Sequence, residues 1–91
     1  MDLKGTEFQI KVWKELSKIP KGEVRTYKQI AKSIGKPRSS RAVANACAKN
    51  PYPIVIPCHR VIRSDGLIGG YRGHGGIKRK KELLQKEGLK F

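Results

Sequence analysis

Two adjacent residues, Cys58 and His59, have the side chains for nucleophilic chemistry. A cysteine attacks as its thiolate, which needs a nearby base or positive dipole to form at neutral pH. Neighbours on an extended strand point to opposite faces, so we expect a water molecule between the two side chains; a direct hydrogen bond would need a turn. Cys58 is the candidate nucleophile, the alternative being an inert buried thiol.

A carboxylate that could orient His59 lies near the end of the chain. Glu87 falls between Leu83 and Leu84 on the apolar side of the last predicted helix, where an unpaired carboxylate would be costly to bury. A carboxylate on one ring nitrogen fixes the histidine tautomer and strengthens the other nitrogen as a base. We therefore expect Glu87 to pair with His59, the alternative being an exposed charge at the helix end.

The remaining cysteine and histidine carry less weight. Cys47 is interpreted as a core residue and His74 as a loop residue. A metal site built from Cys47, Cys58, His59 and His74 would lack the short paired spacing of zinc modules. We therefore expect no metal and no cofactor, and two reduced thiols rather than a disulfide.

The composition indicates where this chemistry takes place. With 91 residues, one small domain over residues 1–91 is expected. The chain shows no apolar run that could span a bilayer and no leader resembling a signal peptide, so we expect a soluble, monomeric protein of the cytoplasm (with the nucleoid) or the nucleus. Lys and Arg number 21 against 7 acidic residues, for a net charge of +14, which favours nucleic acid as partner over a merely soluble basic surface or an acidic membrane.

Two helices are predicted in the first part of the chain. Apolar residues recur at helical spacing over residues 7–19 and stop at Pro20. Thr26 stands three residues before Gln29, the spacing of a capping box, and predicts a second helix that stops at Gly35.

A third helix, capped by Ser39 or Ser40 and running to about Lys49, completes a helix-turn-helix. Its outer face is lean, because Ala44 and Ala48 project almost nothing and Arg41 is its one long side chain. A nucleic-acid groove can therefore approach the helix backbone closely. The inner face is predicted to hold Val43, Ala46 and Cys47, and the outer face Arg41, Asn45 and Ala48.

The segment around the candidate nucleophile is predicted to be extended and largely buried from Asn50 to Pro57, because its prolines restrict the backbone. Residues 61–68, with a turn at Asp65-Gly66, predict a short β-hairpin, which a glycine-rich stretch follows. The predicted fold class is mainly α, a winged helix-turn-helix with a short β-hairpin wing.

The last helix is predicted over residues 77–88, with Ile77, Leu83 and Leu84 inward. Its basic run, Lys78 to Lys81, is expected to face mostly solvent or phosphate.

The residues around Cys58 closely resemble a known active-site motif. Pro57-Cys58-His59-Arg60-Val61, preceded by Asn50-Pro51-Tyr52-Pro53-Ile54-Val55-Ile56, is similar to the active site of the O6-alkylguanine-DNA alkyltransferases. Supporting matches are residues 8–13, Thr26-Tyr27, Arg41-Ala42-Val43, Gly69-Gly70-Tyr71 and Glu87-Gly88. The resemblance covers nearly the whole chain, but only the C-terminal, active-site half of longer family members. Asn45 and Arg72-Gly73-His74 depart from the family's usual small residues.

The resemblance implies a function and a set of roles. A domain of this family enters the minor groove of double-stranded DNA, turns out an O6-alkylguanine and moves its alkyl group to Cys58, once per molecule. Arg41 would fill the space of the flipped base, Tyr27 would hydrogen-bond the guanine, and carbonyls of Cys58 and Val61 would read its amino group. The implied catalytic residues are Cys58, His59, Glu87, Tyr27 and Asn50; the implied DNA contacts are Thr26, Tyr27, Arg41, Ala42, Ala44 and Asn45; the implied substrate pocket is Cys47, Cys58, Val61, Tyr71 and Arg72.

Three other functions agree less well with the sequence. The first is binding of the lesion without repair; relatives with this function lack the reactive cysteine, whereas this chain has Cys58. The second is a winged-helix regulator, whose recognition helix needs long side chains to read base edges. The third predicted helix of this chain has Ala44 and Ala48 instead. The third is a thiol hydrolase that uses Cys58 and His59, but such an enzyme has no need of a net charge of +14.

Overall fold

The first helix begins at a capping box and ends earlier than its apolar pattern predicts. The protein is described by a computed structural model covering residues 3–52, 54–68 and 76–90. Helix α1 (Glu7–Leu16) starts where the Thr6 hydroxyl accepts from the Gln9 N–H at 3.1 Å. The predicted end at residue 19 is wrong: the N–H groups of Lys18 and Ile19 bond three residues back and tighten the chain into a turn. Ile19 is nevertheless buried.

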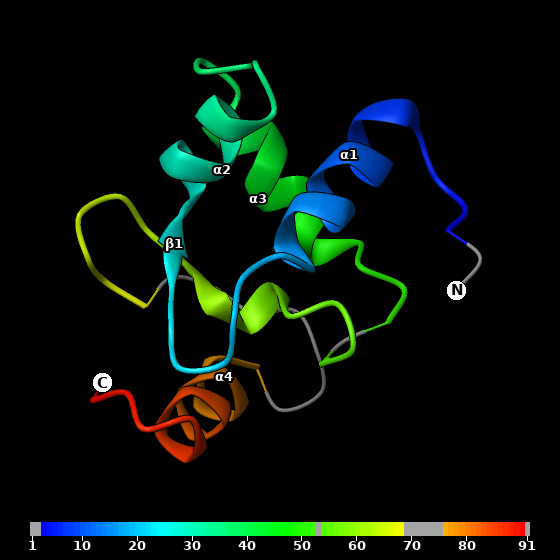
Figure 1. Ribbon diagram of the computed structural model, residues 1–91. Helices are drawn as coiled ribbons and strands as arrows, with labels where there is room; N and C mark the ends of the chain where they lie inside the picture. The colour runs from blue at the N-terminus through cyan, green and yellow to red at the C-terminus, as the bar shows by residue number, and fades with distance from the viewer. Residues whose placement is uncertain (1–2, 53, 69–75, 91) are drawn as a thin grey trace.

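The predicted helix-turn-helix is formed by α2 (Tyr27–Ser33) and α3 (Ser40–Ala48), which lie against each other (Figure 1). The capping box at Thr26 is present, with both of its hydrogen bonds to Gln29. After α2, Gly35 adopts a φ of 78°, a left-handed conformation that suits glycine at a helix end.

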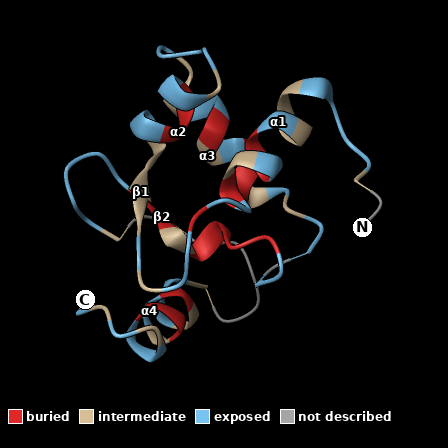
Figure 2. Ribbon diagram, in the orientation of Figure 1, coloured by how far each residue is buried: buried red, intermediate tan, exposed pale blue. Residues whose placement is uncertain are grey.

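The core is packed between α1, α2 and α3 (Figure 2). Trp13 of α1 is buried against α3 and donates its indole N–H to the Ala46 carbonyl at 2.9 Å. The predicted inner face of α3 is confirmed, since Val43, Ala46 and Cys47 are all buried. Arg41 and Asn45 are exposed on the opposite face.

A small sheet joins the helix-turn-helix to the candidate nucleophile. Strand β1 (Arg25–Thr26) pairs in parallel with β2 (Val61–Ile62), and a 3₁₀ turn, η1 (Cys58–Arg60), immediately precedes β2. Beyond β2, the predicted turn at Asp65-Gly66 forms, and the Arg63 N–H donates to the Leu67 carbonyl at 2.9 Å. Leu67 and Ile68 form no strand, so the wing is a short turn and β2 pairs with β1 instead. The mainly helical fold class is confirmed.

The segment before Cys58 is the clearest error of prediction, because it is neither extended nor largely buried. Ile54 has a φ of 74° and is 50% exposed, and Val55 is 66% exposed. The physical cause is Asn50, whose amide donates to the Ile56 carbonyl at 2.7 Å and whose side-chain oxygen accepts from the Tyr52 N–H at 2.9 Å. These bonds fold the segment into a loop, and among its described residues Ile56 and Pro57 are buried.

The last helix, α4 (Gly76–Lys86), lies at the other end of the molecule from α2 and α3, with η1 between them (Figure 1). Leu83 and Leu84 are buried as predicted, but the expected places of Ile77 and Lys80 are reversed. Ile77, in the first turn, is 54% exposed, whereas Lys80 is 0% exposed. Burial of Lys80 is possible because its ammonium donates to the Val61 carbonyl at 2.6 Å. Across the described residues, no helix has the length and apolar character to cross a membrane.

Candidate functional site

The candidate nucleophile and its neighbour lie on a turn rather than on a strand. Cys58 and His59 begin η1, where the Arg60 N–H donates to the Pro57 carbonyl at 2.9 Å. Proline favours this geometry because its ring fixes φ near the value of a helical turn. Both side chains are buried, and neither Cys58 nor Cys47 forms a disulfide. The expectation of an extended strand here is therefore wrong, and the turn removes the reason for placing Cys58 and His59 on opposite faces.

The predicted pairing of His59 with Glu87 is confirmed. The His59 Nε2 atom lies 2.9 Å from Glu87 Oε2, and both side chains are at most one-tenth exposed. The alternative of an exposed carboxylate at the helix end is wrong. Glu87 follows α4 directly, so the packing of α4 against η1 brings the two residues together.

Sequence reasoning missed Arg60, which also binds Glu87. Its Nε donates to Oε1 at 2.9 Å and its Nη2 to Oε2 at 2.8 Å, while Nη1 donates to the Ile19 carbonyl at 2.8 Å. A buried carboxylate needs a cation, and the available signal was an arginine directly after the histidine.

The electrostatics favour a neutral His59. Hydrogen bonds from Arg60 are the main cause that lowers the pKa of Glu87 to about 2, with His59 contributing less. Burial lowers the pKa of His59 below its usual value, although the hydrogen bond that His59 makes to Glu87 acts in the other direction. A neutral His59 donates from Nε2 to Glu87, and its Nδ1 is then an acceptor; this atom is buried with no hydrogen-bond partner among the described residues.

Three further ionisable groups surround the thiol. Burial raises the pKa of Cys47 to about 12, so this predicted pocket residue stays a neutral core thiol. Burial also raises the pKa of Tyr27 to about 12, which keeps its phenol protonated and able to donate. Lys80 lies with its ammonium 5.8 Å from the centre of the Tyr27 ring, and burial lowers its pKa to about 8. A negative charge on the thiolate of Cys47 or Cys58 would raise the pKa of Lys80.

Other predicted site residues have structural partners of their own. Asn50 shapes the loop that leads to Cys58, as described above. The carbonyl of Val61 accepts from the ammonium of Lys80 at 2.6 Å. Tyr71 and Arg72 of the predicted pocket, and His74, lie outside the described residues.

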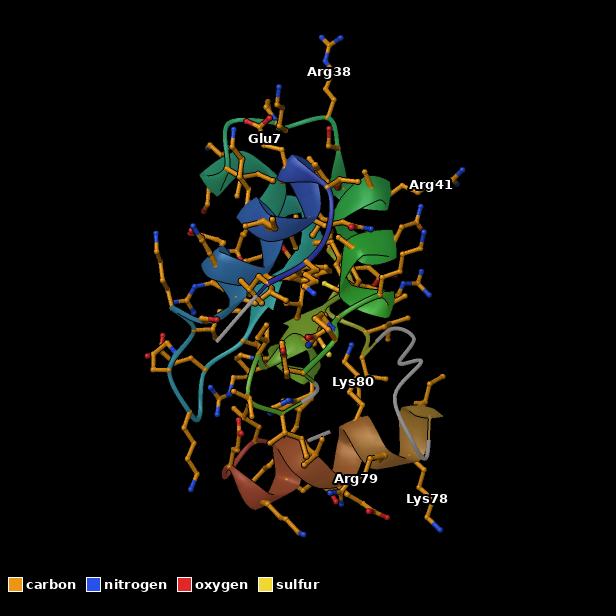
Figure 3. The ribbon with its side chains drawn as sticks, turned by 90° about the vertical axis from the view of Figure 1, so that its right-hand side faces the viewer. Glu7, Arg38, Arg41, Lys78, Arg79 and Lys80 are labelled. Carbon is orange, nitrogen blue, oxygen red and sulfur yellow. The ribbon has the colours of Figure 1, made fainter. Side chains whose placement is uncertain are left out.

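A surface groove of about 490 Å³ lies between the helix-turn-helix and the turn after β2. It brings together Tyr27, Arg41 and Ala44 from the predicted set. Figure 3 shows Arg41 reaching outward from α3, whereas Lys80 points from α4 into the molecule. Ala42 and Asn45 are exposed nearby on α3, and Thr26 is half-buried before α2. Four further residues line the groove that the sequence did not predict: Ser40, Arg63, Ser64 and Asp65. Of these, Arg63 and Asp65 form an ion pair at 2.7 Å.

A metal centre finds no support in residues 3–52, 54–68 and 76–90. Within these ranges no group of three or more histidine, cysteine or acidic side chains is placed to hold an ion. The alternative site of Cys47, Cys58, His59 and His74 is therefore not assembled by its described members.

The fold, with its lean α3 beside an arginine-lined groove, defines a helix-turn-helix domain of the DNA-binding class. Residues 7–89 match the family model described as 6-O-methylguanine DNA methyltransferase, DNA binding domain. The chain belongs to this family.

Individual relatives agree with the family match. A methylated-DNA–protein-cysteine methyltransferase of Methanosarcina barkeri is 58% identical over 91% of this chain. The structure of Mycobacterium tuberculosis OGT in complex with DNA superposes with a TM-score of 0.90 at 52% identity over 94% of this chain. S. pombe Atl1, in complex with damaged DNA containing O6-carboxymethylguanine, superposes with a TM-score of 0.82 at 37% identity, over 97% of this chain and 82% of its own.

The chain spans about half the length of the methyltransferases, 51% of the M. barkeri protein and 52% of the M. tuberculosis one. What matches is the part of the family described as DNA-binding. The comparisons therefore identify this chain with that part of the family.

Proposed function

We propose that this domain carries the active site as well as the DNA-binding surface, and that it moves an alkyl group from O6 of guanine in double-stranded DNA to Cys58. The observation that supports this most strongly is the buried His59, hydrogen-bonded to Glu87 at 2.9 Å and adjacent to Cys58 on one turn. Such a set is what a cysteine needs to become a nucleophile. No metal or cofactor takes part in the proposed reaction.

The proposed reaction balances without another reagent. His59 takes the thiol proton, through a water molecule in our account, and the thiolate attacks the alkyl carbon in line with the departing oxygen. The S–C bond forms as the C–O bond breaks. Tyr27, whose phenol stays protonated, donates toward the leaving guanine, and the proton lost from Cys58 balances the one that guanine gains.

The product explains why each molecule would act once. A thioether has no carbonyl for water to attack, so the site has no route that would restore Cys58 at a useful rate. The protein is consumed as a reagent.

The groove is proposed to hold the DNA. Ala42, Ala44 and Asn45 on the outer face of α3 let the helix approach the minor groove, and Arg41 takes the space of the flipped nucleotide. Thr26 and Tyr27 would contact the phosphates beside it. Flipping costs a few kcal/mol, and a poorly paired O6-alkylguanine lowers that cost. We further propose that the domain acts as a monomer in the compartment that holds the genome.

A second candidate function is lesion recognition without repair. It is favoured by the similarity to S. pombe Atl1, whose solved complex contains O6-carboxymethylguanine in DNA. Both functions predict preference for the lesion, and they differ in what happens to Cys58.

Peptide mass spectrometry after mixing with duplex DNA that carries one O6-methylguanine separates these functions. We expect one added methyl group, on Cys58 of the peptide that contains it. The Cys58→Ser variant and the wild type mixed with undamaged duplex should gain none. Tight lesion binding with an unchanged mass would favour the second function, and no preference for the lesion would contradict both.

A further inference from the structure

Arg60 joins three parts of the molecule at the candidate site. Its guanidinium donates twice to Glu87 after α4 and once to the Ile19 carbonyl after α1, all at 2.8 to 2.9 Å, from its own position on η1. The side chain is 17% exposed and that of Glu87 is 10% exposed. A planar guanidinium that holds both oxygens of a carboxylate sets its orientation as well as its charge.

The same contact decides what His59 experiences. Glu87 Oε2 accepts from Arg60 and lies against His59 Nε2 at the same time. A bare buried carboxylate would draw a proton onto the imidazole, whereas a carboxylate already neutralised by arginine draws it less strongly. The charged groups facing His59 are Glu87 beyond α4, Arg60 on η1 and Lys80 on α4, and the two cations both disfavour a charged imidazole.

We infer that Arg60 is a positioning residue for the proposed transfer: it aims the Glu87 carboxylate at His59 and cancels its charge, so that His59 remains a neutral base with Nδ1 unprotonated. The inference rests on the proposed function for the role of His59. It assigns to the arginine two separable properties, its positive charge and its two-pronged geometry.

Two substitutions separate those properties. Arg60→Lys keeps the charge but cannot hold both carboxylate oxygens and the Ile19 carbonyl together. Arg60→Gln removes the charge. Lys18→Gln is the matched control, because it removes one positive charge next to Ile19 from an exposed ion pair with Glu15.

The direct readout is the titration of the His59 ring nitrogens by NMR in the free protein, which is tractable because the chain has 2 histidines. In the wild type and in Lys18→Gln we expect a neutral imidazole protonated at Nε2 at pH 7. In Arg60→Gln the imidazole should gain its proton at a higher pH than in the wild type, and in Arg60→Lys the titration should stay near the wild type.

The second readout is the rate of methyl transfer at pH 6 relative to pH 8. Because a higher pKa of His59 lowers its neutral fraction at pH 6 more than at pH 8, this ratio should fall in Arg60→Gln and change little in Arg60→Lys. Arg60→Lys should instead lose rate at both pH values, since Glu87 is aimed less well.

The inference would be overturned if the NMR spectrum of Arg60→Gln shows a folded protein in which His59 titrates as it does in the wild type. The proposed function fails separately, if the wild type does not methylate Cys58; the NMR titration would then still decide whether Arg60 controls the charge of His59.

Discussion

Lys80 is a lysine with no exposed surface, held by the Val61 carbonyl beside the candidate nucleophile. Removing an ammonium from water disfavours its charged form, which is why its pKa is lowered to about 8. The folded protein therefore gives up this proton more readily than the unfolded chain does.

This linkage predicts a pH dependence of stability. Between pH 8 and the usual lysine value of 10.5, the unfolded chain binds a proton that folded Lys80 has lost, so rising pH stabilises the fold. Denaturation from pH 7 to 10 should show the wild type gaining stability relative to Lys80→Met, on the order of 3 kcal/mol. Cys47 has the opposite effect, because its raised pKa of about 12 keeps a proton that the unfolded chain loses.

The charge of Lys80 also acts on the pKa of Cys47, so the comparison is repeated in a Cys47→Ala background, which removes the contribution of the thiol. Parallel stability curves for the two proteins would show that Lys80 remains charged and solvated in the folded state.

At the residue scale, sequence reasoning identified side chains more reliably than their partners. It paired His59 with Glu87 because a carboxylate on an apolar helix face needs a partner. It assigned no partner to Arg60 and expected Lys80 to face solvent or phosphate, because the acceptors that hold them lie 27 and 19 residues away in the chain. Helical spacing alone does not reveal such tertiary acceptors.

Among the elements, α1 depends on a short sequence pattern at its beginning. Thr6 and Gln9 form a reciprocal capping box in which each side-chain oxygen accepts from the backbone N–H of the other residue. Thr6→Ala should lower the free energy of unfolding by about 1 kcal/mol, and Thr6→Ser should retain most of it. Urea denaturation measures both, and equal stability of the two variants would mean that the cap contributes nothing.

Helix α3 presents Arg41 to the groove, whereas Arg38 lies in the preceding loop (Figure 3). If Arg41 fills the place of the flipped base, Arg41→Ala should slow methyl transfer from duplex DNA by about tenfold, equivalent to losing about 1.4 kcal/mol of flipping energy. Transfer from free O6-methylguanine base should be unchanged. Arg38→Ala serves as the control, for which we expect weaker binding at most; an equal loss on duplex and free base would rule out this role for Arg41.

Elements were predicted well where local signals exist and poorly where they do not. The capping box at Thr26 and the glycine at position 35 are local signals, and α2 lies between them. The loop after Asn50 was predicted as extended because its prolines allow that state, but side-chain bonds from Asn50 decide otherwise. The parallel pairing of β1 with β2 joins residues far apart in sequence and has no local signal.

For the whole molecule, the net charge of +14 is an electrostatic property spread over many exposed lysines and arginines. It suits a polyanion and supports binding to any DNA, and binding should weaken as salt increases. The proposed preference for a damaged base would have to come instead from the groove and the buried site. The 91 residues contain both, which makes the chain itself the unit to test.

The most direct test is the stoichiometry of methyl transfer by the 91-residue chain with excess duplex carrying O6-methylguanine. We expect protein methylation to rise to one methyl group per chain and stop, with an equal amount of guanine restored in the DNA. Restoration that continues beyond one per chain would contradict the irreversible thioether, and lesion binding without any methylated protein would contradict transfer to Cys58.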